Sequence, residues 1–135
     1  MQKLSGVLLI DDDSTTNFLN ELLVESLGLT EQLLVASTGE QALDLLSQPD
    51  VPAPALILLD VNMPGMTGIQ FLENYYARGL DQQQASVVVM LTTTMDARDL
   101  SRINELHIAG LVSKPLTKEK VDSILQLHFQ RSLAS

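Results

Sequence analysis

The chain has 135 residues, of which 45% are hydrophobic and 19% are charged, with a formal net charge of -9 and no cysteine. This length suits one compact domain with its own core, so we expect a single domain over residues 1–135, without disulfides or thiolate metal sites. The negative charge argues against direct binding to nucleic acid or anionic lipid, and no apolar stretch is long enough to insert into a membrane, so we expect a cytoplasmic protein.

Short apolar runs alternate along the chain with stretches of helical periodicity. This alternation indicates βα repeats and a parallel sheet that is covered on both faces. We expect strands near residues 6–10, 32–36, 55–60, 86–92 and 110–113. The helices are expected near residues 15–28, 38–48, 67–78, 96–107 and 117–131.

The first expected helix carries apolar residues at spacings of three and four, which predicts that they form its core face. These residues are Phe18, Leu19, Leu22, Leu23 and Leu27. Gly28 follows them and suits a left-handed C-cap.

Two residue pairs have the spacing of a capping box, in which each side chain bonds to the backbone of the other residue. Ser37 with Glu40 and Thr67 with Gln70 are these pairs, and they support helix starts at both places.

Chemically reactive side chains follow four of the apolar runs. Asp60 follows the run at 55–59, and Asp11, Asp12 and Asp13 follow the run at 7–10. Thr92 follows residues 87–91, and Lys114 follows residues 110–113. Because the carboxyl ends of parallel strands meet at one edge of a sheet, we expect these groups to converge there.

Carboxylates gathered at one edge repel one another unless a cation offsets their charge. Mg²⁺ suits such a site because it prefers oxygen ligands and binds through one or two carboxylates. Asp60 is then placed to act as a nucleophile toward a phosphoryl donor, since carboxylates form aspartyl phosphates. Lys114 could neutralise the transferred phosphoryl group, and the Thr92 hydroxyl could donate a hydrogen bond to it.

In this order and spacing, these residues resemble the receiver domain of response regulators. The quoted motifs are Asp11-Asp12, the stretch Asp-Val-Asn-Met-Pro-Gly-Met-Thr-Gly that begins at Asp60, Thr92, and Lys114-Pro115. The resemblance covers nearly the whole chain. It implies an α/β, flavodoxin-like fold, with five helices around a doubly wound five-stranded parallel sheet of strand order 2-1-3-4-5.

The resemblance also implies the roles of the site residues. Asp60 is expected to accept a phosphoryl group from a sensor histidine kinase or phosphotransfer protein. Asp11, Asp12 and Asp60, with the backbone carbonyl of Asn62, are expected to hold Mg²⁺. Thr92 and Lys114 are expected to contact the phosphoryl group, and the bond from Lys114 to the following proline resembles one that is cis in receivers.

By the same resemblance, phosphorylation is expected to change the surface of the fourth helix, fifth strand and fifth helix. A downstream protein partner is then expected to read that surface, because no DNA-binding or catalytic segment follows residue 131. Such a chain is a signalling protein that catalyses only its own phosphorylation and dephosphorylation.

Two positions depart from the usual receiver pattern. Leu111 stands where receivers usually carry a Tyr or Phe that moves inward on activation. Thr93 stands where a small Ala or Gly is commoner, and we hypothesise that its bulk restricts water access and slows dephosphorylation.

Two alternative functions fit part of the sequence. A receiver-like scaffold would bind its partner without being phosphorylated. A phosphohydrolase of the haloacid dehalogenase type would use Asp11, Asp13 and Thr15 as its Asp-x-Asp-x-Thr motif, but the chain lacks a later acidic cluster at a strand end. The simpler role for Asp13 is a helix cap, and His107 and His128 are expected to be surface or partly packed residues.

Overall fold

One parallel sheet of five strands forms the centre of the protein. The structure, a computed structural model, describes residues 3–80, 86–93, 101–102, 105 and 108–130. The strands are β1 (Val7–Ile10), β2 (Leu33–Ala36), β3 (Leu56–Asp60), β4 (Val87–Thr92) and β5 (Gly110–Ser113). They lie in the order β2-β1-β3-β4-β5 with every neighbouring pair parallel, which confirms the flavodoxin-like expectation.

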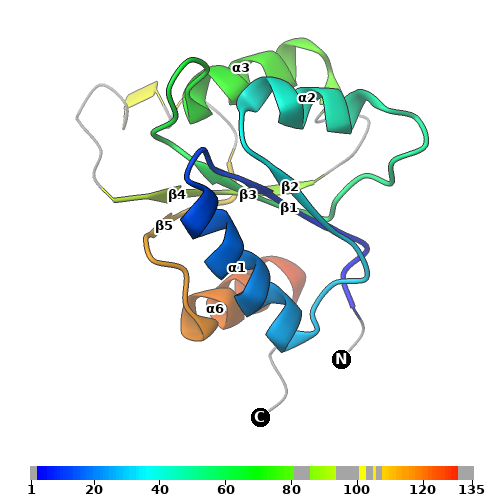
Figure 1. Cartoon of the computed structure of the whole chain (residues 1–135), viewed down its shortest axis with the longest axis vertical. Coiled ribbons are helices and arrows are strands. Elements are labelled where there is room, and N and C mark those ends of the chain that lie inside the picture. The colour runs from blue at the N-terminus through cyan, green and yellow to red at the C-terminus, as the bar shows by residue number, and fades with distance from the viewer. Residues whose placement is uncertain (1–2, 81–85, 94–100, 103–104, 106–107, 131–135) are drawn as a thin grey trace.

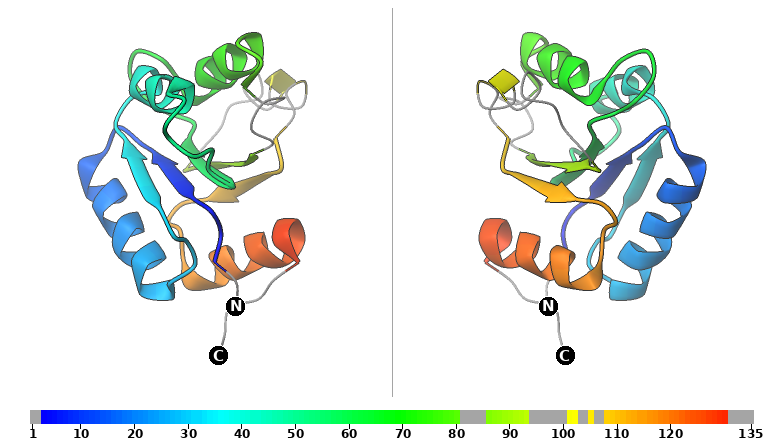
Figure 2. Two further views of the ribbon diagram at one scale, coloured as in Figure 1. Left: turned by 90° about the vertical axis from the view of Figure 1, so that its right-hand side faces the viewer. Right: turned by 90° about the vertical axis from the view of Figure 1, so that its left-hand side faces the viewer.

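Helices cover both faces of this sheet. They are α1 (Ser14–Leu27), α2 (Gly39–Ser47), α3 (Gly68–Ala77) and α6 (Lys118–Phe129). Helices α2 and α3 lie on one face and α1 and α6 on the other (Figures 1 and 2). None of the helices in the described residues is long and apolar enough to cross a membrane.

Four helices have both ends within the described residues, whereas five helices were expected. The expected helix at 96–107 falls mainly outside the described residues, although Ser101, Arg102 and Glu105 within it are helical. The fold class holds, because the strand order and the two helical layers are those expected.

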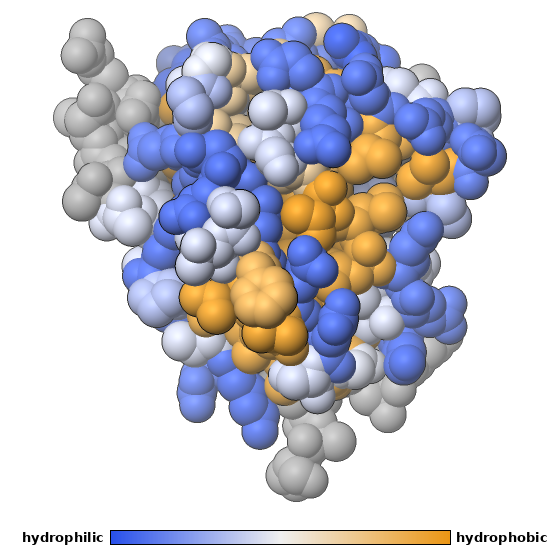
Figure 3. Space-filling model, in the orientation of Figure 1, coloured by the Kyte–Doolittle hydropathy of each residue, from blue (hydrophilic) through white to orange (hydrophobic). Residues whose placement is uncertain are grey.

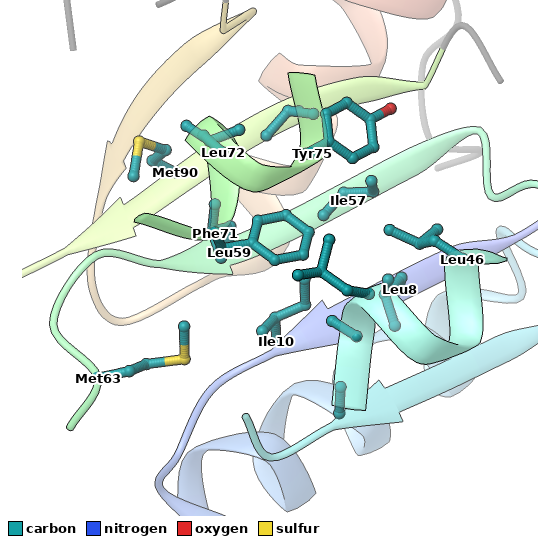
Figure 4. Close-up of a cluster of buried hydrophobic side chains, with 14 of the residues drawn as sticks. Leu8, Ile10, Leu46, Ile57, Leu59, Met63, Phe71, Leu72, Tyr75 and Met90 are labelled. Atoms are coloured by element: carbon teal, nitrogen blue, oxygen red, sulfur yellow. The ribbon is translucent and has the colours of Figure 1, made fainter. Parts of the chain in front are cut away.

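The core consists of two apolar clusters, one on each face of the sheet. In β3, Ile57 and Leu59 face the α2/α3 cluster, whereas Leu56 and Leu58 face the α1/α6 cluster. Successive strand side chains point to opposite faces, so a strand that is buried on both faces must be apolar throughout. Figure 4 shows the first cluster, where Phe71 and Tyr75 of α3 lie over the strands.

The expected core face of α1 is wrong in part. Phe18, Leu19 and Leu22 are 59%, 57% and 49% exposed, whereas Leu23 and Leu27 pack against the α1/α6 cluster. The residues of α1 that are buried are Asn17, Asn20 and Val24. The apolar periodicity correctly predicted a helix but assigned the wrong face of that helix to the core. Two asparagines, Asn17 and Asn20, occupy positions that face inward.

The helix ends agree with most of the expected capping. Gly28 ends α1 with a left-handed φ of 59°, and Thr67 with Gln70 forms the expected capping box of α3. The pairing of Ser37 with Glu40 is wrong by one residue. Thr38 is the N-cap of α2, because its hydroxyl accepts the Gln41 N–H at 3.0 Å, while the Gln41 side chain accepts the Ser37 N–H at 2.7 Å.

Candidate functional site

The carboxyl ends of four strands bring the expected site residues to one edge of the sheet. Asp11 directly follows β1, which is in register with β3, and Asp60 is the last residue of β3. Thr92 ends β4. Lys114 directly follows β5, and its backbone N–H donates to the Thr92 carbonyl at 2.8 Å. The sheet therefore positions all four residues through its own register.

The Lys114 ammonium lies between two buried carboxylates. Its Nζ is 2.8 Å from Asp11 Oδ2 and 3.0 Å from Asp60 Oδ1. Asp11 and Asp60 are each 3% exposed, while Asp12 beside them is exposed. Among the described residues, Lys114 is the only cation that pairs with these carboxylates.

The carboxylates of Asp11, Asp12 and Asp60 also form a possible cation site. One oxygen of each lies within 4.8 Å of the other two. Hard oxygen ligands at this separation suit a divalent ion such as Mg²⁺. The donor set therefore fits the metal that the sequence analysis expected.

Burial and charge shift the protonation of this site. Burial raises the pKa of the Asp60 carboxyl from 3.8 to about 6, and the Asp11 charge adds to this, while Lys114 and the Asn62 N–H oppose it. Burial alone would lower the pKa of the Lys114 ammonium, but its hydrogen bonds to Asp11 and Asp60 outweigh that effect and raise it. One ammonium thus compensates incompletely for the clustered acidic groups.

Backbone and amide donors hold the acidic residues in place. Asp11 Oδ1 accepts the Asp13 N–H at 2.9 Å, and Asp60 Oδ1 accepts the Asn62 N–H at 3.3 Å. Buried Asn17 donates through Nδ2 to the Asp11 carbonyl at 2.7 Å. Sequence reasoning missed Asn17, since an asparagine in a helix carries no signal of this contact.

Gly68 allows the start of α3 to approach the backbone of Asp60. A Cβ at this position would clash with the Asp60 carbonyl oxygen and lie 2.9 Å from Val61 Cα. Any side chain here would therefore displace the end of β3. Gly68 was named from the sequence only as part of a motif, although glycine is the usual residue where a backbone must approach closely.

The other residues singled out from the sequence occupy different surroundings. Asp13 caps α1, accepting the N–H groups of Thr15 and Thr16, as its simpler role predicts. Thr92 is buried and Asn62 is exposed. The Lys114–Pro115 peptide bond is cis, as expected from the resemblance.

The comparisons with known proteins agree on one family. The family model of the response regulator receiver domain matches residues 7–126. The probable chemotaxis protein CheY of Rhizobium etli is 30% identical, with 91% of each chain covered. The transcriptional regulatory protein CpxR of Escherichia coli is 33% identical over 96% of this chain, which spans about half (51%) of that protein. A crystal structure of a two-component response regulator from Cytophaga hutchinsonii has a TM-score of 0.82 and 27% identity, covering 96% of this chain and all of that one.

The raised pKa of Asp60 predicts that its ionisation destabilises the Mg²⁺-free protein. The folded state holds the Asp60 proton more tightly than the unfolded state, so the free energy of unfolding falls as pH rises from about 4 to about 6. This rise of roughly two units in the pKa of Asp60 corresponds to a loss of about 3 kcal/mol in the free energy of unfolding at high pH. Asp60→Asn removes the ionisable group, so it should raise the free energy of unfolding by about 1–3 kcal/mol at pH 7.5 in EDTA. Urea denaturation measures this gain, which should disappear near pH 4. Asp44→Asn, at an exposed aspartate of α2, is the matched control and should leave the stability unchanged. An Asp60→Asn protein that is no more stable than the wild type at pH 7.5 contradicts the raised pKa of Asp60.

Proposed function

The chain belongs to the response regulator receiver domain family, and on that premise we propose that it is a switch in which Asp60 accepts a phosphoryl group from a histidine kinase or phosphotransfer protein. Receiver domains are signalling modules of two-component systems. The observation that carries the proposal is the Lys114 ammonium bonded to both Asp11 and Asp60 beside a third carboxylate.

The chemistry requires an ionised Asp60 and compensation of the transferred charge. A carboxylate oxygen of Asp60 attacks the phosphorus, and the bond between phosphorus and the donor nitrogen breaks with its electron pair leaving on the imidazole. Lys114 is then close to the new phosphoryl oxygens, and the Thr92 hydroxyl is proposed to donate to one of them.

Asp11, Asp12 and Asp60 are proposed to hold Mg²⁺, together with the backbone carbonyl of Asn62. The bound ion would neutralise negative charge on the carboxylates and on the phosphoryl oxygens. Two observations support this assignment: the spacing of the three carboxylates, and the fact that Lys114 is the one ammonium that pairs with Asp11 and Asp60 in the described part of the chain.

The donor is proposed to dock on the exposed apolar residues of α1. Phe18, Leu19 and Leu22 project from this helix, over which Figure 3 shows an apolar area among polar atoms. A groove of about 380 Å³ has both Leu19 and Lys114 among its lining residues and so joins this surface to the site. A donor seated there could present its phosphorylated side chain to Asp60.

The output is proposed to use the face made by β5 and α6, with the helix expected at 96–107. A second groove, of about 390 Å³, lies between β5 and α6. Leu111 lines it and is 42% exposed, and Leu127 beside it is 76% exposed. A downstream protein with a complementary apolar surface is the proposed reader, and a cytoplasmic location stays a prediction.

The two alternatives receive less support. In the phosphohydrolase alternative Asp13 would take part in the reaction, but its Oδ1 accepts hydrogen bonds from the first turn of α1. The phosphorylation-independent scaffold does not explain why a lysine and two carboxylates, Lys114 with Asp11 and Asp60, are paired in a buried position.

Incubation with acetyl phosphate and Mg²⁺ tests the proposed function directly. Intact-mass measurement should show the gain of one phosphoryl group by the wild type and none by Asp60→Asn, because the nucleophile is lost. Asp50→Asn, at an exposed aspartate outside the site, should gain the group as the wild type does. A wild type that gains nothing, either here or from a histidine kinase, favours the scaffold.

Thr93 is predicted to slow the loss of the phosphoryl group. It is exposed and lines the groove that contains Lys114, so its bulk lies on a route by which water can approach. Thr93→Ala should shorten the lifetime of the aspartyl phosphate about threefold, the rate effect of roughly 0.7 kcal/mol. Thr93→Val keeps the bulk without the hydroxyl and should decay as the wild type does. Equal lifetimes for the alanine variant and the wild type reject the hypothesis.

The α1 surface is predicted to matter for a protein donor but not for a small one. Phe18→Ser and Leu22→Ser should each slow transfer from a phosphorylated kinase about 10- to 100-fold, because fully burying one such side chain contributes roughly 1.5–3 kcal/mol and about 1.4 kcal/mol is tenfold. Phosphorylation by acetyl phosphate should be unchanged. Leu127→Ser, at the exposed leucine of α6, is the control and should not slow transfer. If only this variant slows transfer, the donor docks on α6 and not on α1.

A further inference from the structure

Lys120, in the first turn of α6, binds the chain on both sides of Lys114. Its Nζ donates to the Ser113 carbonyl at 2.7 Å, to Ser113 Oγ at 3.2 Å and to the Pro115 carbonyl at 2.9 Å. An ammonium has three hydrogens, so these three acceptors use its full capacity. The Lys120 clamp, as we call these three bonds, is distinct from the ion pairs made by Lys114.

The clamp acts where the chain leaves the sheet. The Lys114 N–H bonds to the Thr92 carbonyl, and Pro115 has no N–H with which to continue the ladder. Lys120 itself is fixed by α6, since its backbone N–H donates to the N-cap hydroxyl of Thr117 at 3.2 Å. The link from β5 to α6, visible below the sheet in Figure 1, is therefore tied at both ends of Lys114.

We propose that Lys120 is a positioning residue for phosphoryl transfer: its ammonium holds the backbone at Ser113 and Pro115 so that the Lys114 side chain reaches both Asp11 and Asp60. This role rests on the proposed function. Lys120 contacts neither carboxylate in the described hydrogen bonds and ion pairs, and so acts only through Lys114.

The placement of Lys114 is sensitive to small shifts of this backbone. Its Nζ must lie within hydrogen-bond distance of two carboxylates at the ends of different strands, one directly after β1 and one at the end of β3. Misplacement of a reacting or charge-compensating group by about 1 Å can lower a rate as much as a hundredfold. A loosened link thus lowers the rate of transfer without removing any residue that touches the phosphoryl group.

The first test is made on the unphosphorylated protein and is independent of the proposed function. Lys120→Met removes the ammonium and keeps most of the aliphatic stem. Hydrogen exchange of the Lys114 amide should accelerate about tenfold, while amides in β1 and β3 exchange as before, because opening is local. Lys118→Met is the matched control, since Lys118 is exposed at the start of the same helix. Unchanged exchange at Lys114 overturns the clamp.

The second test measures the rate constant for phosphorylation by acetyl phosphate at saturating Mg²⁺. Lys120→Met should lower it about tenfold and Lys120→Arg should recover part of the loss, with Mg²⁺ affinity unchanged within about twofold because the carboxylates stay in place. In a Lys114→Met background, Lys120→Met should change the rate less than about twofold, since residues that act as a unit are not additive. An equal loss in both backgrounds overturns the positioning role.

Two further outcomes distinguish failure of the clamp from failure of the variant to fold and from failure of the proposed function. If Lys120→Met does not fold, Lys120→Gln, which keeps an amide donor, is judged by the same exchange and rate criteria. If the wild type accepts no phosphoryl group, the proposed function and the positioning role fail, while the exchange measurement still decides whether the clamp exists.

Discussion

The contact of one ammonium with two buried carboxylates is the constraint on which this structure depends. Lys114 bonds to Asp11, directly after β1, and to Asp60, the last residue of β3, and both carboxylates are almost fully buried. Burying paired charges is costly unless their geometry and remaining hydrogen bonds are good. Here the backbone N–H groups of Asp13 and Asn62 supply further bonds, yet the site keeps an excess of negative charge. Because of this excess negative charge, the site can bind a cation and offers a carboxylate that can act as a nucleophile.

The strand ends of the sheet determine where these groups lie. Strands that are buried on both faces must be apolar along their length, so polar side chains are confined to their ends. Parallel register then places the ends of β1, β3, β4 and β5 at one edge. Gly68 lets α3 approach Asp60, and Asn17 fixes the Asp11 carbonyl from α1. Asp60 and Thr92 thus lie at the last positions of strands, and Asp11 and Lys114 directly follow strands.

The apolar runs and their polar ends were sufficient to predict a parallel sheet and the convergence of Asp11, Asp60 and Lys114, because they are strong local signals. The strand order was predicted from the resemblance to receiver domains, and the structure confirms it. Helical periodicity misjudged α1, where the apolar stripe at Phe18 faces outward and asparagines face inward. That choice depends on a tertiary contact at Asp11, which helical periodicity does not encode. The cap of α2 shifted by one residue because Ser37 and Thr38 are both good N-caps. Most of the expected helix at 96–107 lies outside the described residues, so its bounds stay a prediction.

Identification of the phosphorylated residue tests the central claim most directly. After treatment with acetyl phosphate and Mg²⁺, the acyl phosphate can be trapped by borohydride reduction and located by peptide mass spectrometry. We expect a reduced residue at position 60, because that carboxylate ends β3 beside the Lys114 ammonium. A reduced residue at position 11 instead would contradict it, since Asp11 would then be the nucleophile and the arrangement would be that of a phosphohydrolase.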